Sequence, residues 1–513
     1  MGSEARSANL WASTGNLLAW APALRVGAAC LAVAAFFGCL VCPPARADVG
    51  IVLNESLDTS VARITGSGHS AVYFSRICAD GPVKLRLCAA GERGSVMSNY
   101  TTLGEDRPFE WNVVPLSIYL YGVEDPELEP VYGSEKIKHA LEERYREKYL
   151  TGYCESKTCR TGNGSEWREM VGATLSRSIY IFIVATTVEQ DQNLIAEFNS
   201  LPNQNHFNGV TRNCADFTRR VINTYFPRAV SPDYINDFGM TSPKAIAHSF
   251  SRYALRHPES QYRALHYAQL PGRIKRSTEV RAGTEQLYRS KKLLVPMIIF
   301  ADHELPFVAA SYLLTGRFNP EHESEEHPSI EVTEADHEIY RAKAEKNEAR
   351  VKELQGVLRD RRADVVGTSK EWSAYKTAFA LVVDEAVRNE IIPNRKYLDH
   401  FYHRLEATGT LALEADGTSA MEISNQDEKT RVGLNASNIL SRGSDPELAY
   451  VLMLTRIDRV LKSPKHSRET MPEFRRDWEL LQAARIKTID VDSPPALPGV
   501  AMRSGVAASI GKN

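Results

Sequence analysis

Apolar positions along this chain follow two spacings, and the change between them predicts where strands and helices lie. Residues 66–68 are Gly-Ser-Gly and run into the β-branched and aromatic segment 69–74, which predicts a turn followed by a core strand. Residues 179–185 are a second run of this kind, and residues 83–87 alternate apolar and basic positions as a strand does. Residues 112–121 are apolar and predict a partly extended segment.

Helical spacing appears between these strand-like runs. Residues 135–149 are charged and predict a surface helix, and residues 188–201 carry apolar positions at intervals of three and four. Strands and helices mixed in this way favour an α+β fold, with an antiparallel sheet and helices packed on one side. We assign this domain to residues 48–257.

The character of the chain changes after residue 258. Residues 258–328 are expected to be a connecting segment with an apolar helix, and residues 329–491 a mainly α-helical C-terminal region, followed by a disordered tail at 492–513. Further predicted helices in the C-terminal region are residues 334–365, which suit an exposed helix or short coiled coil, and residues 371–390, 394–406 and 446–461.

Two stretches of the connecting segment need separate interpretation. Residues 293–318 are hydrophobic but carry Asp302, His303, Glu304 and Pro306, so they predict a core helix or a peripheral membrane contact rather than a spanning helix. Residues 321–327 read Glu-His-Glu-Ser-Glu-Glu-His, with histidines five apart instead of the four that a zinc-binding helix uses. We interpret them as a solvated acidic linker and expect no metal site and no cofactor.

The N-terminus has the pattern of a secretory signal peptide. Arg6 and Arg25 precede an apolar run at residues 26–42, and the small residues before position 48 predict cleavage after Ala47. A retained anchor and lipidation at Cys39 are the alternatives. We therefore expect an exported protein, periplasmic or associated with the outer envelope.

Charge excludes one class of partner. The chain has 62 Lys and Arg against 64 Asp and Glu, for a net charge of −2, and no basic stripe is evident. A nucleic-acid partner is therefore not expected.

Five of the eight cysteines would remain after cleavage of the signal peptide. Cys78 and Cys88 flank the turn signal at 79–82 and could pair across a hairpin, and Cys154 and Cys159 close a short loop. In an oxidising compartment this pairing leaves Cys214 as a candidate reactive thiol. The alternatives are that one or both pairs stay reduced, or that Cys214 is an inert buried thiol.

Local sequence places Cys214 at the start of a helix. Apolar residues from Phe217 to Phe226 describe one helix face, Asn213 is a suitable N-cap, and Asp216 is a first-turn acid. The unpaired N–H groups and positive dipole end of a helix N-terminus stabilise a thiolate, lower its pKa, and can donate to an oxyanion. The position therefore suits a nucleophile.

His69 is the candidate base. It stands at the start of the predicted strand 69–74, after glycines that allow close approach. The alternative is a hydrogen-bonded structural histidine beside a turn. His206, His248 and His257 lack such a setting.

Together, Gly68-His69, Asn99-Tyr100 and Asn213-Cys214 resemble motifs of the circularly permuted NlpC/papain-like superfamily, which includes lecithin retinol acyltransferase-like proteins. More closely, their order is similar to the bacterial periplasmic Lnb N-terminal-like domain family, over about residues 50–253. The resemblance implies a Cys-His pair with a third polar group that orients the imidazole. Asn99 matches that third position, and Glu92 and Glu105 are competing candidates.

These features predict an exported thiol hydrolase or acyltransferase, of amidase or peptidase type, that acts through an acyl-enzyme on a cell-envelope peptide, amide or lipid substrate. The alternative is a catalytically inactive binding or maturation module for another exported or membrane protein, with the C-terminal helices as the surface for that protein partner. Fold alone does not separate the two, because function resides in the site.

Overall fold

The computed structural model describes residues 47–57, 68–99, 109–154, 166–204, 212–237, 240–289, 317–327, 367–425, 428–462 and 471–489, with isolated positions between 310 and 364. Most of the predicted signal peptide, Glu105, Cys159, His206 and the predicted tail lie outside the described residues. The same holds for most of segments 293–318 and 334–365. No helix in the described part of the chain is long and apolar enough to cross a membrane.

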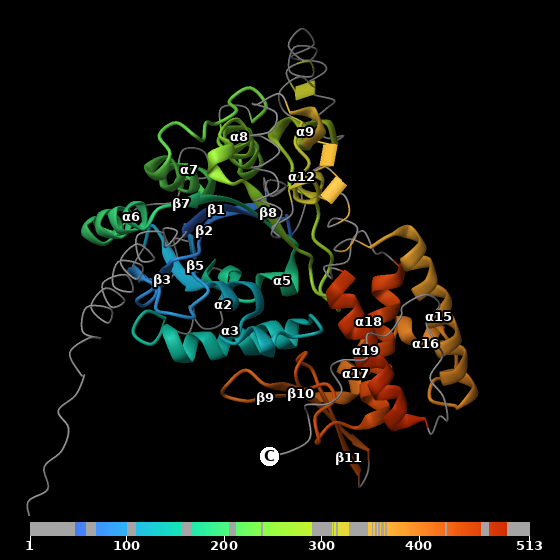
Figure 1. Ribbon diagram of the computed structural model, residues 1–513. Helices are drawn as coiled ribbons and strands as arrows, with labels where there is room; N and C mark the ends of the chain where they lie inside the picture. The colour runs from blue at the N-terminus through green and yellow to red at the C-terminus, as the bar shows by residue number, and fades with distance from the viewer. Residues whose placement is uncertain are drawn as a thin grey trace, which may run out of the picture. The chain divides into compact units, whose positions relative to one another are not determined.

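A six-stranded antiparallel sheet forms the centre of the N-terminal region, in the order β6-β5-β2-β1-β7-β8 (Figure 1). Its strands are β1 (Ala47–Asn54), β2 (His69–Phe74), β5 (Ser95–Ser98), β6 (Asn112–Pro115), β7 (Ile179–Thr186) and β8 (Arg263–Tyr267). Strand β1, which the sequence pattern did not predict, is paired on both sides. Strand β8 adds to the sheet beyond residue 257, so residues 263–267 belong to it and not to a connector.

Helices cover both faces of this sheet, whereas the pattern predicted helices on one side. Alternate side chains of a strand point to opposite faces, so each central strand contributes to two apolar cores. On one face, Val72 packs with α6 (Val188–Ser200), α7 (Cys214–Tyr225) and α8 (Pro243–Arg256). On the other, Ala71 packs with α2 (Leu116–Tyr121), α3 (Glu135–Tyr149) and α5 (Ala173–Ser176). The α+β class is confirmed.

Local predictions in this region are largely confirmed. The strand at 69–74 and the helix at 135–149 have the predicted bounds, and β7 and α6 match their predictions within one residue. Residues 112–121 are extended only over β6, because α2 begins at Leu116 and ends where Gly122 takes a left-handed φ of 77°. A single turn of helix followed by a glycine cap gives little periodicity to detect in sequence.

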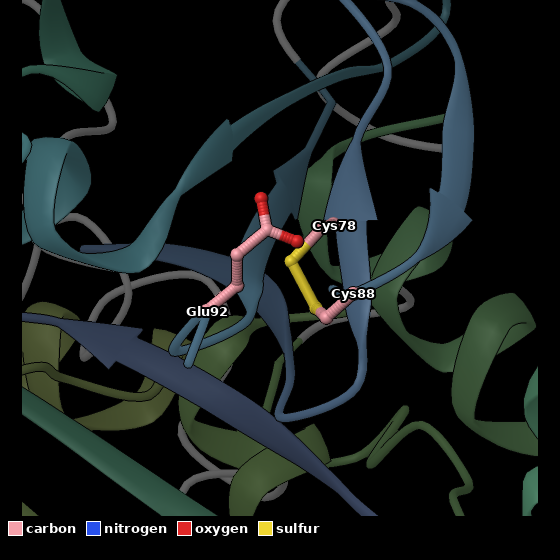
Figure 2. A group of neighbouring side chains, drawn as sticks. All are labelled: Cys78, Cys88 and Glu92. Atoms are coloured by element: carbon pink, nitrogen blue, oxygen red, sulfur yellow. A yellow bond between two sulfur atoms is a disulfide. The ribbon is translucent and has the colours of Figure 1, made fainter. Parts of the chain in front are cut away.

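The predicted hairpin carries the predicted disulfide. Strands β3 (Ile77–Ala79) and β4 (Leu85–Leu87) pair antiparallel, and Cys78 is bonded to Cys88. Figure 2 shows the Glu92 carboxylate beside this bond. Glu92 accepts two hydrogen bonds of 2.7 Å from Arg86, which are the first cause of its pKa being lowered to about 2. Cys154 is also disulfide-bonded, and its predicted partner lies outside the described residues.

Removing this hairpin disulfide with the Cys78→Ala/Cys88→Ala double variant should lower the free energy of unfolding by about 3 kcal/mol, because the bond restricts the unfolded chain. Urea unfolding followed by circular dichroism would measure the change. Cys214→Ala is the matched control, since it removes a thiol without opening a loop. Equal stability of the double variant and the native protein would contradict the prediction.

The acidic stretch at 321–327 forms a helix instead of the expected linker. Asn319 caps α12 (Pro320–Glu326) by accepting from the N–H groups of Glu321 and His322. The helix packs on β7 and β8, and the Tyr262 hydroxyl donates to Glu323 over 2.9 Å. An N-cap followed by proline starts the helix despite its like charges.

The C-terminal region contains helices and a small sheet. Helices α15 (Ser369–Arg388) and α18 (Pro446–Lys462) match predicted helices, and the predicted helix 394–406 is divided into α16 (Lys396–Asp399) and α17 (Phe401–Thr408). Strands β9 (Gly409–Leu413), β10 (Ser419–Asn425) and β11 (Glu428–Gly433) and helix α19 (Met471–Thr488) were not predicted. Asp416-Gly417, with Gly417 at φ 99°, is the hairpin signal that could have revealed β9 and β10.

This C-terminal region is joined to the N-terminal region by specific contacts. Tyr132 stacks on Tyr402 with ring centroids 4.5 Å apart, and its hydroxyl donates to the buried Glu406 over 3.2 Å. The N–H of Val131 donates to the carbonyl of Leu434 over 2.9 Å. The segment at 130–133 is therefore one of the places where β9–β11 and α17 attach to the N-terminal region.

Candidate active site

Cys214 is the first residue of α7, as predicted. The Asn213 side chain accepts from the N–H groups of Ala215 and Asp216 at 2.8 and 3.0 Å, and the Asp216 carboxylate receives the Asn213 N–H. This reciprocal capping box fixes the start of the helix. Cys214 is a free, buried cysteine, 9% exposed.

The thiol of Cys214 is held against strand β2. The N–H and hydroxyl groups of Ser70 and the first N–H groups of α7 act to lower the pKa of this thiol. The Ser70 hydroxyl is in turn 3.3 Å from the Thr218 hydroxyl on the next turn of α7. Ser70 directly follows His69, and α7 packs on β2, so Cys214 lies against the strand that carries the histidine.

His69 begins β2, where a sharp turn brings it into the sheet. Gly68 has a left-handed φ of 67°, and a Cβ there would collide with the carbonyl oxygen of Asn54 on β1. Only glycine tolerates both conditions, so the glycine before the histidine has a structural cause. The imidazole Nε2 lies 2.6 Å from the Ser98 hydroxyl on β5, and this hydrogen bond fixes the ring orientation.

Ser98, and not Asn99, supplies the polar contact to Nε2. The two residues lie on opposite faces of the chain at the end of β5, and both are buried, Ser98 at 0% and Asn99 at 5% exposed. Asn99 donates from Nδ2 to the Glu110 carbonyl over 2.5 Å, and its Oδ1 has no hydrogen-bond partner. Of the competing acids, Glu92 is committed to Arg86. A serine inside a short strand gives no sequence signal, so Ser98 was missed.

Burial keeps both the thiol and the imidazole neutral. Desolvation, helped by the Arg177 charge, lowers the pKa of His69 to about 3, although the residue as a whole keeps some exposure. Desolvation raises the pKa of Cys214 above its usual range, although Ser70 and the first N–H groups of α7 act to lower it. The helix terminus was expected to lower this pKa. That expectation is wrong in sign because burial outweighs the helix N-terminus.

A neutral Cys214 thiol beside a neutral His69 imidazole predicts an unusual dependence of the acylation rate on pH. Between the pKa of His69, about 3, and the raised pKa of Cys214, the number of protons on the pair is constant. The acylation rate of Cys214 should therefore be flat with pH across the interval between these two pKa values. The unfolded protein should instead become about tenfold faster per pH unit below the thiol pKa. Stopped-flow acylation across this range would distinguish them, and a native profile that rises like that of the unfolded thiol would contradict the neutral pair.

A groove with a cavity volume of about 770 Å³ runs along α7 from the capping residue Asn213. Asn213, Asp216, Arg219 and Arg220 line it from α7, and Asn99 lines it from the end of β5. The groove is therefore lined by Asn213, the residue before the nucleophile, and by Asn99, whose buried Oδ1 accepts no hydrogen bond.

Within the part of the chain that the structure describes, the other chemically notable groups do not assemble into a second catalytic centre. Among the described residues, one set of His, Cys, Asp and Glu lies close enough to hold a metal ion, Cys78, Cys88 and Glu92, and its sulfurs are bonded to each other. His248 on α8 stacks on Phe318 with centroids 5.2 Å apart, and its pKa is lowered mainly by burial. These groups serve packing and crosslinking.

Comparison of the chain with protein-family models, with curated proteins and with solved structures finds no significant match in any of the three.

Proposed function

We propose that the protein is a thiol hydrolase or acyltransferase of the permuted papain-like type, with Cys214 as nucleophile, His69 as base and Ser98 as the residue that orients the base. One observation carries this proposal: α7 packs on β2, which places Cys214 beside Ser70, the residue after His69, while Nε2 of His69 is held by Ser98. A nucleophile, a base and an orienting group in this relation are the parts of a catalytic triad.

In the proposed reaction the Cys214 sulfur attacks the carbonyl carbon of an amide or ester. With Nε2 engaged by Ser98, Nδ1 takes the thiol proton and then gives it to the leaving amine or alcohol as the C–N or C–O bond breaks. The resulting thioester is cleaved by water, or by an acceptor, which returns the proton to the sulfur through the same imidazole.

The developing oxyanion needs hydrogen-bond donors near the sulfur. The Asn213 side chain occupies the N–H groups of Ala215 and Asp216, and the N-cap does not use the Cys214 N–H. This N–H is the donor at the helix terminus that is positioned to stabilise the oxyanion. The N-cap thus holds the N–H groups of Ala215 and Asp216 and leaves that of Cys214 for the oxyanion.

An exported location in the periplasm or outer envelope, and a cell-envelope peptide, amide or lipid substrate, are part of the same proposal. Two observations support them: a signal-like N-terminus, and disulfide-bonded cysteines at Cys78, Cys88 and Cys154. Disulfides persist mainly in oxidising compartments.

A second candidate function is a binding or maturation module without catalysis. The buried, neutral thiol favours it, since an enzyme of the preformed thiolate type would show a lowered cysteine pKa. An enzyme in which a neutral imidazole removes the thiol proton during attack does not need a lowered cysteine pKa.

Acylation by p-nitrophenyl acetate separates the two functions. At pH 6, native Cys214 should acquire one acetyl group, seen by intact mass, faster than the same thiol in urea. Slower acylation of the native protein would favour the binding module. Cys214→Ala must lose the adduct, because the other described cysteines are disulfide-bonded.

Ser98→Ala should slow this acylation by about tenfold, because the imidazole loses the group that orients it. Ser98→Thr retains a hydroxyl and should keep most of the rate. The pH profile should also change for Ser98→Ala, since a ring free to rotate regains solvent and a higher pKa. Identical rates for the alanine and native proteins would remove Ser98 from the proposed triad.

A further inference from the structure

A cavity of about 670 Å³ is lined by residues at one end of the central sheet and by residues of helices α18 and α19. The sheet contributes the ends of β1, β7 and β8 and the loops that adjoin them. All of the lining residues belong to the compact unit formed by residues 47–513. The members of the proposed triad are not among them, so this cavity is separate from the candidate active site.

The sheet end of the cavity carries a buried carboxylate. Glu55 is 9% exposed, and its carboxylate accepts from the Ser277 hydroxyl over 2.6 Å but forms no ion pair with any residue of the described chain. Burial raises the pKa of Glu55, and the nearby charges of Glu279 and Glu321 act in the same direction. Glutamate is almost never fully buried without a partner of opposite charge. This part of the cavity is therefore suited to receive a positive charge.

A buried hydroxyl lies next to that carboxylate. The Glu55 N–H donates to the Ser178 carbonyl over 3.0 Å, which makes the side chains of Glu55 and Tyr180 diagonal neighbours on one face of the sheet. Tyr180 is 5% exposed and stacks on His266 with ring centroids 4.5 Å apart. Its hydroxyl forms no hydrogen bond within the described part of the chain. Buried tyrosine hydroxyls usually have a partner, so this one is available to a ligand in the cavity.

Two arginines of the same cavity have no carboxylate partner in the ranges that the structure describes. Arg276 donates to the Gln269 carbonyl over 2.6 Å, and the guanidinium of Arg459 lies 4.8 Å from the centroid of the Tyr402 ring. Desolvation and then the charge of Arg459 lower the pKa of Arg276, as is expected for two cations that line one cavity. An anion between them would stabilise both.

We propose that this cavity binds a small zwitterion of the amino-acid class. The ammonium group of the ligand has three donors, and it binds at the Glu55 carboxylate and the Tyr180 hydroxyl, which are acceptors. The carboxylate of the ligand binds at Arg276 and Arg459, because guanidinium groups match a carboxylate in geometry as well as charge. The two ends of the ligand thus use the groups that the protein leaves without partners of opposite charge.

Other ligand classes fit this lining less well. It carries more carboxylates than arginines, so an anion alone would meet net repulsion, and a cation alone would leave Arg276 and Arg459 without a counter-charge. The one set of described residues close enough to hold a metal ion is Cys78, Cys88 and Glu92, which lies elsewhere. The zwitterion site goes beyond the proposed thiol chemistry and does not depend on it.

Amino acids with a terminal amine test the proposal, because the distance between their two charges can be varied. Isothermal titration of the full chain with the series from glycine to aminohexanoate should find a member that binds about tenfold more tightly than the alkylamine and the carboxylate of the same length, since only the zwitterion makes both sets of ionic hydrogen bonds. An alkylamine or a carboxylate that binds as tightly as the best zwitterion, or a series that does not bind at all, would overturn the proposal.

Substitutions at each end of the cavity should have different effects. Glu55→Gln should lower the affinity for the zwitterion to that for the matched carboxylate, and Arg276→Gln should lower it to that for the matched alkylamine. Tyr180→Phe keeps the ring that stacks on His266 and removes only the hydroxyl, so it should weaken binding while the urea midpoint of unfolding stays native. Native affinity in either charge variant would contradict the assignment of that end.

Three variants serve as controls. Glu189→Gln on α6 and Arg442→Gln in the turn before α18 remove the same charges from exposed positions outside the cavity, and both should bind the zwitterion with native affinity. Cys214→Ala should also bind it natively, so failure of the proposed thiol chemistry and failure of this site are distinguishable. A loss of affinity in these variants equal to that in the cavity variants would refute the site.

Discussion

Replacing His69 by glutamine is expected to slow acetylation of Cys214 by p-nitrophenyl acetate about 10²- to 10⁴-fold, the range found for removal of a positioned general base. The effect should be large because the thiol has a raised pKa and few molecules ionise without a base at neutral pH. Glutamine fills a similar volume and can bond Ser98, so the loss would reflect proton transfer. Stopped-flow release of nitrophenol, with the adduct counted by intact mass, measures it.

His248→Gln is the appropriate control for that experiment. His248 is also a histidine whose pKa is lowered chiefly by burial, but it stacks on Phe318 and lies on α8. Its substitution should leave the rate within about twofold of native. If His69→Gln retains the native rate, the imidazole is not the base and the binding-module function gains support.

Gly272→Ala is expected to produce the largest loss of stability, about 3 kcal/mol or more, through a clash that no side-chain movement relieves. Gly272 forms a bridge with Gly133, and a Cβ at 272 would collide with the carbonyl oxygen of Gly133 and lie 2.6 Å from its carbon. The bridge is held by hydrogen bonds from Gly133 N–H to Pro271 and from Arg273 N–H to Gly133. Urea unfolding measures the loss.

The same substitution should loosen the C-terminal region. Gly133 follows Tyr132, whose ring stacks on Tyr402, so a backbone shift at 133 weakens that attachment. Limited trypsin digestion should therefore cleave the Gly272→Ala variant faster than the native protein. Gly443→Ala, where an added Cβ meets nothing within 4 Å, is the control for the change of residue type. Equal stability of both variants would refute the clash.

Local signals in the sequence were sufficient for most elements of the N-terminal region. The cap at Asn213, the charged helix 135–149 and the hairpin crosslink at Cys78 each depend on residues within about fifteen positions of one another. Such features are determined by side-chain spacing and turn chemistry, which a sequence displays directly.

The features of the site that the sequence did not reveal depend on strand register and burial. Ser98 meets His69 because β5 pairs with β2, and no property of the serine itself indicates this. The sign of the Cys214 pKa shift depends on how much protein surrounds the sulfur, whereas sequence displayed only the helix N-terminus that opposes it. The prediction that residues 321–327 form a linker was wrong. It rested on their charge, whereas the N-cap Asn319 and the following Pro320 start a helix there.

The central place of β1 has a consequence for how the chain folds. Asn54 pairs with His69 on one side and with Ile179 on the other, so more than half of the strand's residue pairings join positions more than 120 apart. Closing so long a loop precedes the gain from pairing, which makes sheet formation slow and nearly all-or-none. Until residues 179–186 have emerged from synthesis, one edge of β1 stays open and able to pair with another chain. Assembly of the sheet that carries His69 is thus completed late.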